Sequence, residues 1–200
     1  MQYTTRKSGS DDSAVWKGLA AGLIGGLVGS WTMNRFQDVW SKVSHSLENS
    51  PGDQFRNASG EAACGGEDPD THNSEFSSQP EAQDDTTVRT ASAISEGVFD
   101  HKLTPGEKKI AGTAVHYLLG TSVGGLYGAA AERAPNVTAG AGLPFGAAFW
   151  LVVDEGAVPL LGLSKGPMAY PVSTHAYALS SHFVYALTAE LVRRAVRRAL

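Results

Sequence analysis

Five ionisable residues lie within or beside apolar stretches of the chain, where they could bind protons or a ligand. They are His116, Asp154, Glu155, His175 and His182. Ionisable groups inside a membrane are costly and are often functional, and histidine changes its charge near neutral pH. His175 and His182 are seven residues apart, so they share one face of a helix. These residue types predict a His–carboxylate cluster that titrates or binds a ligand, provided that their segments meet.

The alternative interpretation is structural: each of these side chains bonds a neighbouring backbone group or lies among lipid headgroups. Histidines and carboxylates also suit zinc, iron or nickel, but the helical pairs His-x-x-x-His and Glu-x-x-His are absent. We therefore expect no metal and no other cofactor. The single cysteine, Cys64, excludes an internal disulfide, and the net charge of -4 argues against a general nucleic-acid binder.

Four apolar stretches carry these residues, and each is a candidate membrane-spanning helix. A span needs about 20 apolar residues to cross about 30 Å of hydrocarbon. The stretches cover residues 19–33, 110–131, 137–163 and 174–189. The second satisfies the length outright, and the first does so if Trp16 and Lys17 reach the interface. The sequence predicts an all-α polytopic membrane protein with about four transmembrane helices. The alternatives are buried helices of a soluble protein and, for the first stretch, a signal peptide.

Glycines recur at every fourth residue in the first two stretches. Such spacing forms grooves through which helices in lipid approach closely. It suits packing within one chain and homo-oligomerisation equally well. The glycines concerned are Gly18, Gly22 and Gly26 in the first stretch, and Gly120, Gly124 and Gly128 in the second.

A polar, acidic segment separates the first two stretches. Residues 34–109 hold 14 acidic and 7 basic residues, and residues 48–92 contain few large apolar side chains. We predict that 48–92 is a disordered loop. Residues 1–47 would form a tail, the first transmembrane helix and an amphipathic extension, and residues 93–200 a three-helix transmembrane region. Thr104-Pro105-Gly106-Glu107 is typical of a capping box, so the second helix should begin near Pro105.

Basic residues near both ends predict that both termini are cytoplasmic and that the acidic loop is outside. Lys17 precedes the first stretch and four arginines follow the fourth, whereas Lys108 and Lys109 oppose this orientation. In it, His116, the two carboxylates and His182 share the outer third of the bilayer, and His175 lies at the outer surface. The four arginines after the fourth stretch are Arg193, Arg194, Arg197 and Arg198.

Glu190 stands three residues before Arg193 and four residues before Arg194. This spacing predicts a structural ion pair at the cytoplasmic interface.

Several segments together are similar to the YagU-like family of uncharacterised bacterial inner-membrane proteins. They are Gly18-Leu19-Ala20-Ala21, the His116 stretch with Gly128 and Ala131-Glu132, residues 159–163, and Ser181-His182-Phe183-Val184-Tyr185 followed by Glu190 and Arg193-Arg194. The resemblance implies a small multi-pass protein of the cytoplasmic membrane, in a family with which acid tolerance is associated. The 48–90 loop departs from the family pattern.

These observations favour a non-enzymatic multi-pass inner-membrane protein that acts in envelope or acid-stress physiology. The alternative is a small proton- or ion-coupled transporter that uses the His–carboxylate cluster. A membrane enzyme or metal protein is the least favoured class. The expected partners are the lipid bilayer and further copies of the chain, without nucleic acid, and the sequence does not identify a small-molecule or ion ligand.

Overall fold

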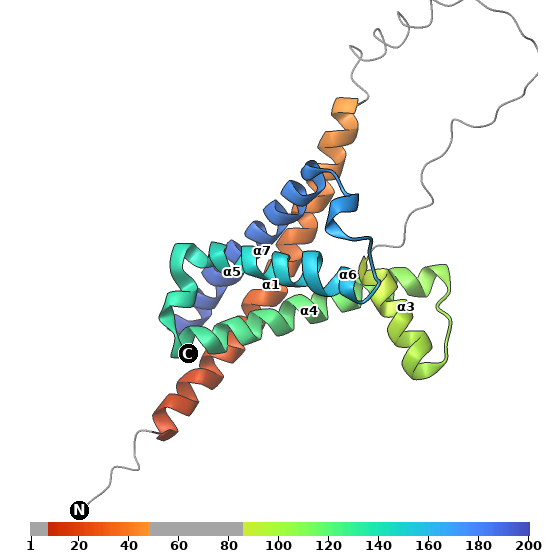
Figure 1. The fold of residues 1–200 in the computed structure, drawn as a ribbon. Helices are drawn as coiled ribbons and strands as arrows, with labels where there is room; N and C mark the ends of the chain where they lie inside the picture. Colours follow the sequence, from red (N-terminus) through yellow and green to blue (C-terminus); the bar gives the residue numbers. More distant parts are fainter. Residues whose placement is uncertain (1–7, 49–85) are drawn as a thin grey trace, which may run out of the picture. The chain divides into compact units, whose positions relative to one another are not determined.

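The computed structural model describes residues 8–48 and 86–200, and the regular elements within these two ranges are helical. The all-α prediction is confirmed for this part of the chain. One stretch in it, Pro135–Leu160, is long and apolar enough to cross a membrane. The elements are α1 (Ser8–Glu48), α3 (Thr86–Phe99), α4 (Pro105–Arg133), η2 (Pro135–Gly142), α5 (Leu143–Val152), η3 (Val153–Ala157), α6 (Val158–Leu160), η4 (Pro167–Ala169) and α7 (Val172–Ala199) (Figure 1).

Helix α3 corrects the prediction for the acidic segment. Residues 49–85 of the predicted loop lie outside the described residues, but residues 86–92 form the first half of α3. Ala91 is buried, and Val88 packs so closely on α4 that a Cβ added to Gly112 would lie 2.6 Å from its Cγ2. Disorder was wrongly predicted here because these apolar residues, three apart, form a helical face that α4 covers.

The start of α4 is the capping box that the sequence predicts. The Thr104 hydroxyl accepts from the Glu107 backbone N–H at 3.4 Å, and the Glu107 carboxylate accepts from the Thr104 backbone N–H at 2.8 Å. Pro105 occupies the first helical position. The backbone hydrogen bond from Thr104 lowers the pKa of Glu107, which keeps this exposed carboxylate in its accepting form.

The third apolar stretch is broken, whereas the sequence predicted one helix over 137–163. Three successive residues adopt left-handed backbone conformations: Gly140 (φ 58°), Ala141 (φ 55°) and Gly142 (φ 83°). Glycine enters this region without the steric cost of a Cβ, so the two glycines permit the reversal. α5 begins directly after it and packs on α7, where a Cβ on Gly146 would lie 2.9 Å from the His182 carbonyl oxygen.

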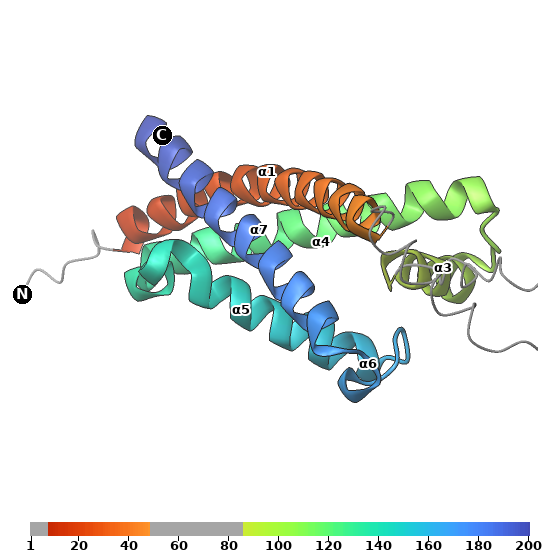
Figure 2. The ribbon, with the colours of Figure 1, turned by 90° about the horizontal axis from the view of Figure 1, so that it is seen from above.

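Glycines bring the backbones of α1 and α4 into contact. A Cβ on Gly26 would lie 2.5 Å from the Gly120 carbonyl oxygen, and a Cβ on Gly124 would lie 2.5 Å from the Gly26 Cα. Another face of α1 meets α7, where a Cβ on Gly25 would lie 2.5 Å from the Ala189 carbonyl oxygen. Figure 2 shows α1 beside α4, with α7 crossing both helices. In this structure the glycine repeats serve packing within one chain.

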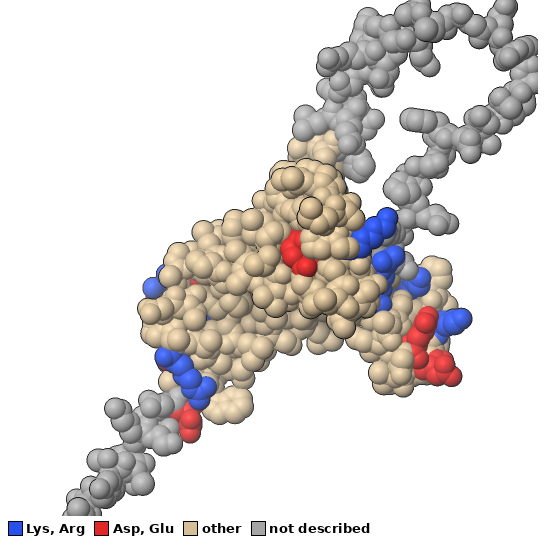
Figure 3. All heavy atoms as spheres, viewed as in Figure 1, with Lys and Arg blue, Asp and Glu red and all other residues tan. Residues whose placement is uncertain are grey.

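The interior between these helices consists mainly of small residues, a few aromatic rings and Met33. Tyr185 is 1% exposed, lies over Gly29, and donates its hydroxyl to the Gly120 carbonyl oxygen at 2.6 Å. Many large aliphatic side chains instead point outward, and Figure 3 shows a broad, largely uncharged surface that is interrupted by one acidic patch. Examples of exposed leucines are Leu27, Leu118, Leu126, Leu151 and Leu191.

The last part of α1, residues 37–48, belongs to a separate unit of the chain. It forms the last turns of α1. Val39, Trp40 and Val43 are each at least half exposed, so this part carries apolar side chains on its surface.

We predict that Gly124→Leu destabilises the fold, because its side chain would meet the backbone of α1 rather than a movable side chain. Overpacking a core typically costs about 1–3 kcal/mol, and backbone contact puts this site at the upper end. Thermal unfolding in mild detergent measures the loss. Gly106→Leu, in the first turn of the same helix, is the control, since a Cβ there meets nothing within 4 Å. Equal behaviour of the two variants would contradict the packing.

Candidate functional site

A π-helical turn carries the two candidate carboxylates. In η3 the Val158 backbone N–H donates to the Val153 carbonyl oxygen, five residues earlier. Pro159 explains why the helix widens here: it has no N–H to donate to the Glu155 carbonyl, and its ring would clash with that carbonyl in a regular α-helix. Such turns occur often at functional sites. The wide turn carries the adjacent residues Asp154 and Glu155, and each contacts a different histidine of α7.

His175 and Glu155 form the shorter of the two His–carboxylate pairs. The His175 Nδ1 lies 2.6 Å from Glu155 Oε1, and the two side chains are 24% and 14% exposed. The other ring nitrogen, Nε2, lies 3.0 Å from the Pro167 carbonyl oxygen. His175 was predicted at the outer surface; it stands in the first turn of α7, but η3 and η4 hold it on both sides.

This geometry requires a dissociable proton between His175 and Glu155. A carbonyl oxygen only accepts, so Nε2 must donate its hydrogen to Pro167. The 2.6 Å contact at Nδ1 then needs a second hydrogen, placed either on the ring or on the carboxyl group. The hydrogen bond to Glu155 raises the pKa of His175, which favours imidazolium beside carboxylate. The pair is thus built to hold a proton that ordinary histidine releases near pH 6.5.

His182 and Asp154 form a second, looser pair one heptad further along α7. The His182 Nε2 lies 3.7 Å from Asp154 Oδ2, which is within ion-pair range but too long for a direct hydrogen bond. Nδ1 lies 2.8 Å from the Ala178 carbonyl oxygen and must be the donor there. The ring is almost buried and stands edge-on to Phe149 at 5.2 Å. Nε2 is therefore the ring atom that faces Asp154.

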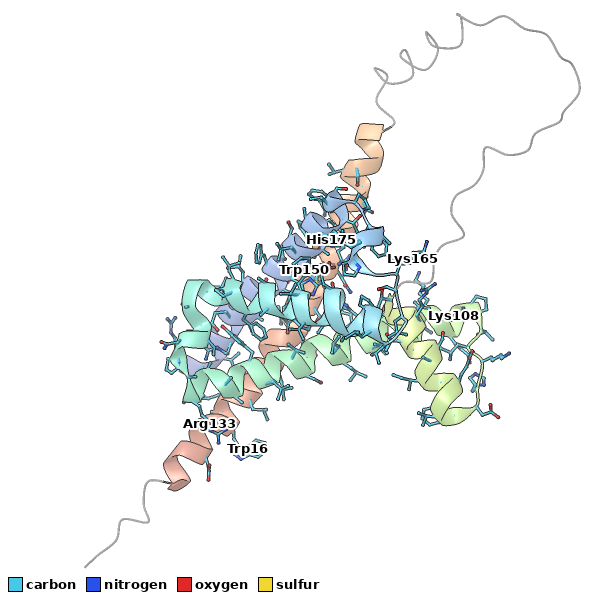
Figure 4. The ribbon with its side chains drawn as sticks, viewed as in Figure 1. Trp16, Lys108, Arg133, Trp150, Lys165 and His175 are labelled. Atoms are coloured by element: carbon cyan, nitrogen blue, oxygen red, sulfur yellow. The ribbon has the colours of Figure 1, made fainter. Side chains whose placement is uncertain are left out.

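Trp150 lies beside the first His–carboxylate pair. The Trp150 ring of α5 lies edge-on to His175, with 6.4 Å between centroids, and Figure 4 shows the two side by side.

His116, predicted as a member of the cluster, belongs to neither pair: it lies on α4, with its ring edge-on to Tyr117 at 5.8 Å. Of the five predicted residues, the structure joins four into two pairs.

Glu190 lies at the centre of a second polar group, towards the other end of α7. Its side chain is fully buried and accepts hydrogen bonds from Arg193 at 2.7 and 2.9 Å, from Arg194 at 2.5 Å and from the Tyr127 hydroxyl at 3.0 Å. The arginine partners are those that the spacing predicts. Two arginines and a phenol satisfy both carboxylate oxygens, so the buried charge is fully compensated.

Sequence reasoning missed the link between this group and the end of α4. Arg197 donates to both oxygens of Glu132, at 2.8 and 3.1 Å, and Arg193 lies 3.9 Å from the same carboxylate. Arg197 follows Arg193 by four residues, so the two share a helical face. That spacing was visible in the sequence, but the partner on α4 was not.

The described residues thus define a helical protein whose long helices pack through glycines, with one membrane-competent stretch and two His–carboxylate pairs. A family model described as "Protein of unknown function (DUF1440)" matches residues 88–191, just over half of the chain. The chain belongs to the DUF1440 family, which agrees with the predicted resemblance to an uncharacterised family. No curated protein and no solved structure matches the chain. The matched range contains both His–carboxylate pairs and Glu190, but not α1.

We predict that Glu190→Ala strongly destabilises the protein. It would leave the buried Arg193 guanidinium without its main partner, and breaking a buried ion pair costs about 3–5 kcal/mol. Arg194→Gln is the matched comparison, because Arg194 is 44% exposed and its loss should cost about 1 kcal/mol or less. Unfolding in detergent reports both values, and similar small losses would show that the Glu190 group contributes little.

We also predict that stability declines as the pH rises through the raised pKa of His175. The contribution is complete below the unfolded-state pKa of about 6.5 and disappears once the folded protein loses the proton. Melting temperatures measured from about pH 5 to about pH 9 should fall in this window for the native chain and less steeply for Glu155→Gln. Glu96→Gln, an exposed carboxylate on α3, should keep the native slope. Identical slopes for all three proteins would contradict a stabilising His175–Glu155 pair.

Proposed function

We propose that this chain is a non-enzymatic, multi-pass protein of the bacterial inner membrane that responds to pH through its His175–Glu155 pair. The observation that carries the proposal is the 2.6 Å contact between His175 and Glu155, which requires a proton while the second ring nitrogen is already used. Proton release from this pair would remove a contact that holds α7 against the π turn. We further propose that the protein is YagU-like, with a role in envelope or acid-stress physiology.

The distribution of side chains supports membrane embedding with four spans. Many large aliphatic residues point outward, while small residues fill most of the interior together with Met33, Tyr127 and Tyr185. This arrangement is expected where lipid surrounds the helices. Helix α4 has 29 residues and therefore spans about 44 Å, enough for a bilayer. The proposed spans are the apolar parts of α1 and α4, the third stretch after its backbone reversal (residues 143–160), and α7 beyond its first turn, so that His175 lies at the outer surface.

Orientation is tested by labelling the native Cys64 in intact cells. In the proposed topology both ends are cytoplasmic, so Cys64 in the acidic segment should react with a membrane-impermeant maleimide without permeabilisation. Reaction only after the inner membrane is opened would reverse the orientation. The predicted homo-oligomer is tested on the same material by light scattering in detergent.

Proton binding is tested through Trp150, whose ring lies beside His175. Protonated imidazole quenches indole fluorescence, so emission should rise as His175 loses its proton. The experiment uses a chain in which Trp16, Trp31 and Trp40 are replaced by phenylalanine. Glu155→Gln should move the midpoint down by about one pH unit or more, because an adjacent carboxylate favours the charged ring. His182→Gln is the control and should keep the midpoint. Emission without a transition between about pH 5 and about pH 9 would overturn the proposal.

A proton-coupled transporter is the second candidate, favoured by one observation. The two pairs follow each other on one face of α7, seven residues and about 10 Å apart, as successive sites of a proton path would. Proteoliposomes with an internal pH dye distinguish the two functions. A transporter should dissipate an imposed pH gradient, more slowly after Asp154→Asn, whereas an acid-responsive protein without transport should leave the gradient intact.

A further inference from the structure

Basic side chains from three helices gather at the end of the described chain opposite the His–carboxylate pairs. The Lys17 ammonium group donates to the Leu200 carbonyl oxygen at 2.8 Å, which places the early part of α1 beside the end of α7. Arg197 reaches Glu132 at the end of α4, and Figure 4 shows Arg133 at this same end. We call this surface the basic end; its residues are Lys17, Arg133, Arg193, Arg194, Arg197 and Arg198.

The two glutamates at the basic end are turned inward. Glu190 is fully buried and the Glu132 side chain is 15% exposed, and they neutralise the inner arginines of α7. Lys17, Arg133 and Arg198 are exposed, and in the described part of the chain their charges are not paired with either of these glutamates. Asp12 of α1 is also exposed, so the outer surface of the basic end carries three cations, Lys17, Arg133 and Arg198, near one carboxylate and has a net positive charge.

Apolar surface borders these cations directly. Trp16 precedes Lys17 in α1 and is 68% exposed, while Leu191 lies about one helical turn before Arg194 and is 63% exposed. Ala195 is also exposed, so apolar side chains continue between the charged residues of α7. Tryptophan and basic residues together are typical of the headgroup layer of a membrane. The basic end therefore has the composition of a surface that meets lipid headgroups.

We propose that the basic end binds the phosphate of an anionic phospholipid headgroup. The inference rests on the membrane embedding in the proposed function. Guanidinium groups donate two parallel hydrogen bonds to phosphate oxygens, and Arg133 and Arg198 are exposed for this contact. Lys17 adds a point charge on the same surface. A headgroup held there would contact α1, α4 and α7 at once, and it would stabilise the packing of these helices.

The test uses the full chain in mild detergent, with phosphatidylglycerol or phosphatidylcholine added in mixed micelles. Phosphatidylglycerol should raise the melting temperature, while phosphatidylcholine and inorganic phosphate should not. The variant Arg133→Gln with Arg198→Gln should weaken the apparent affinity for phosphatidylglycerol roughly tenfold, since juxtamembrane basic residues each attract anionic lipid. The matched control is Lys102→Gln with Lys109→Gln, which removes two exposed cations elsewhere and should keep the native affinity.

Equal stabilisation by both lipids, or an unchanged affinity in the Arg133 and Arg198 variant, would overturn the proposal. If that variant does not fold, native mass spectrometry of the unaltered chain replaces it, and retention of phosphatidylglycerol no better than of phosphatidylcholine overturns the proposal. Carbonate extraction of cell membranes separates the two proposals. Release of the chain by carbonate refutes membrane embedding, whereas a retained chain without lipid preference refutes only the headgroup site.

Discussion

The backbone contact between the glycines of α1 and α4 is the constraint on which the other contacts depend. Where Gly26 lies against Gly120 and Gly124, the backbones of the two helices touch without a side chain of either glycine between them. The same closeness lets α1 meet α7 along a second face, and Tyr185 then fills the space between the three helices with its hydroxyl on the Gly120 carbonyl. A side chain at Gly124 would push α1 away and thereby disturb contacts that α1 makes with α7.

Helix α7 connects two polar groups of different character. Near its start, His175 and His182 face carboxylates of the π turn, in pairs that remain partly accessible. Further along, Glu190 is fully buried among arginines and a tyrosine hydroxyl. The His175–Glu155 pair holds a dissociable proton, whereas a carboxylate held by two guanidinium groups remains ionised. Titration near one end and a permanent ion-pair network near the other suit a helix that responds to pH while one part stays anchored.

Much of the local structure was predictable because short-range rules govern it. The capping box at Thr104 and Glu107 and the bonds of Glu190 to arginines three and four residues later follow from helical geometry alone. The break in the third apolar stretch was not predicted, since hydropathy records which residues are apolar and not where the backbone reverses. Helix α3 was missed for a related reason: its few apolar residues stabilise the helix only when α4 covers them.

The sequence by itself determined the helical class, the glycine spacing and the residues that could titrate, because these depend on periodicity and side-chain chemistry. Only the tertiary structure decided which groups meet. It joined Glu155 to His175 and Asp154 to His182, left His116 on another helix, and brought Glu132 to Arg197. The physical reason is that a pairing between helices depends on their rotation and depth relative to each other. Those quantities are set by the glycine contacts and by the π turn before Pro159, which act over the whole bundle and not within one helix.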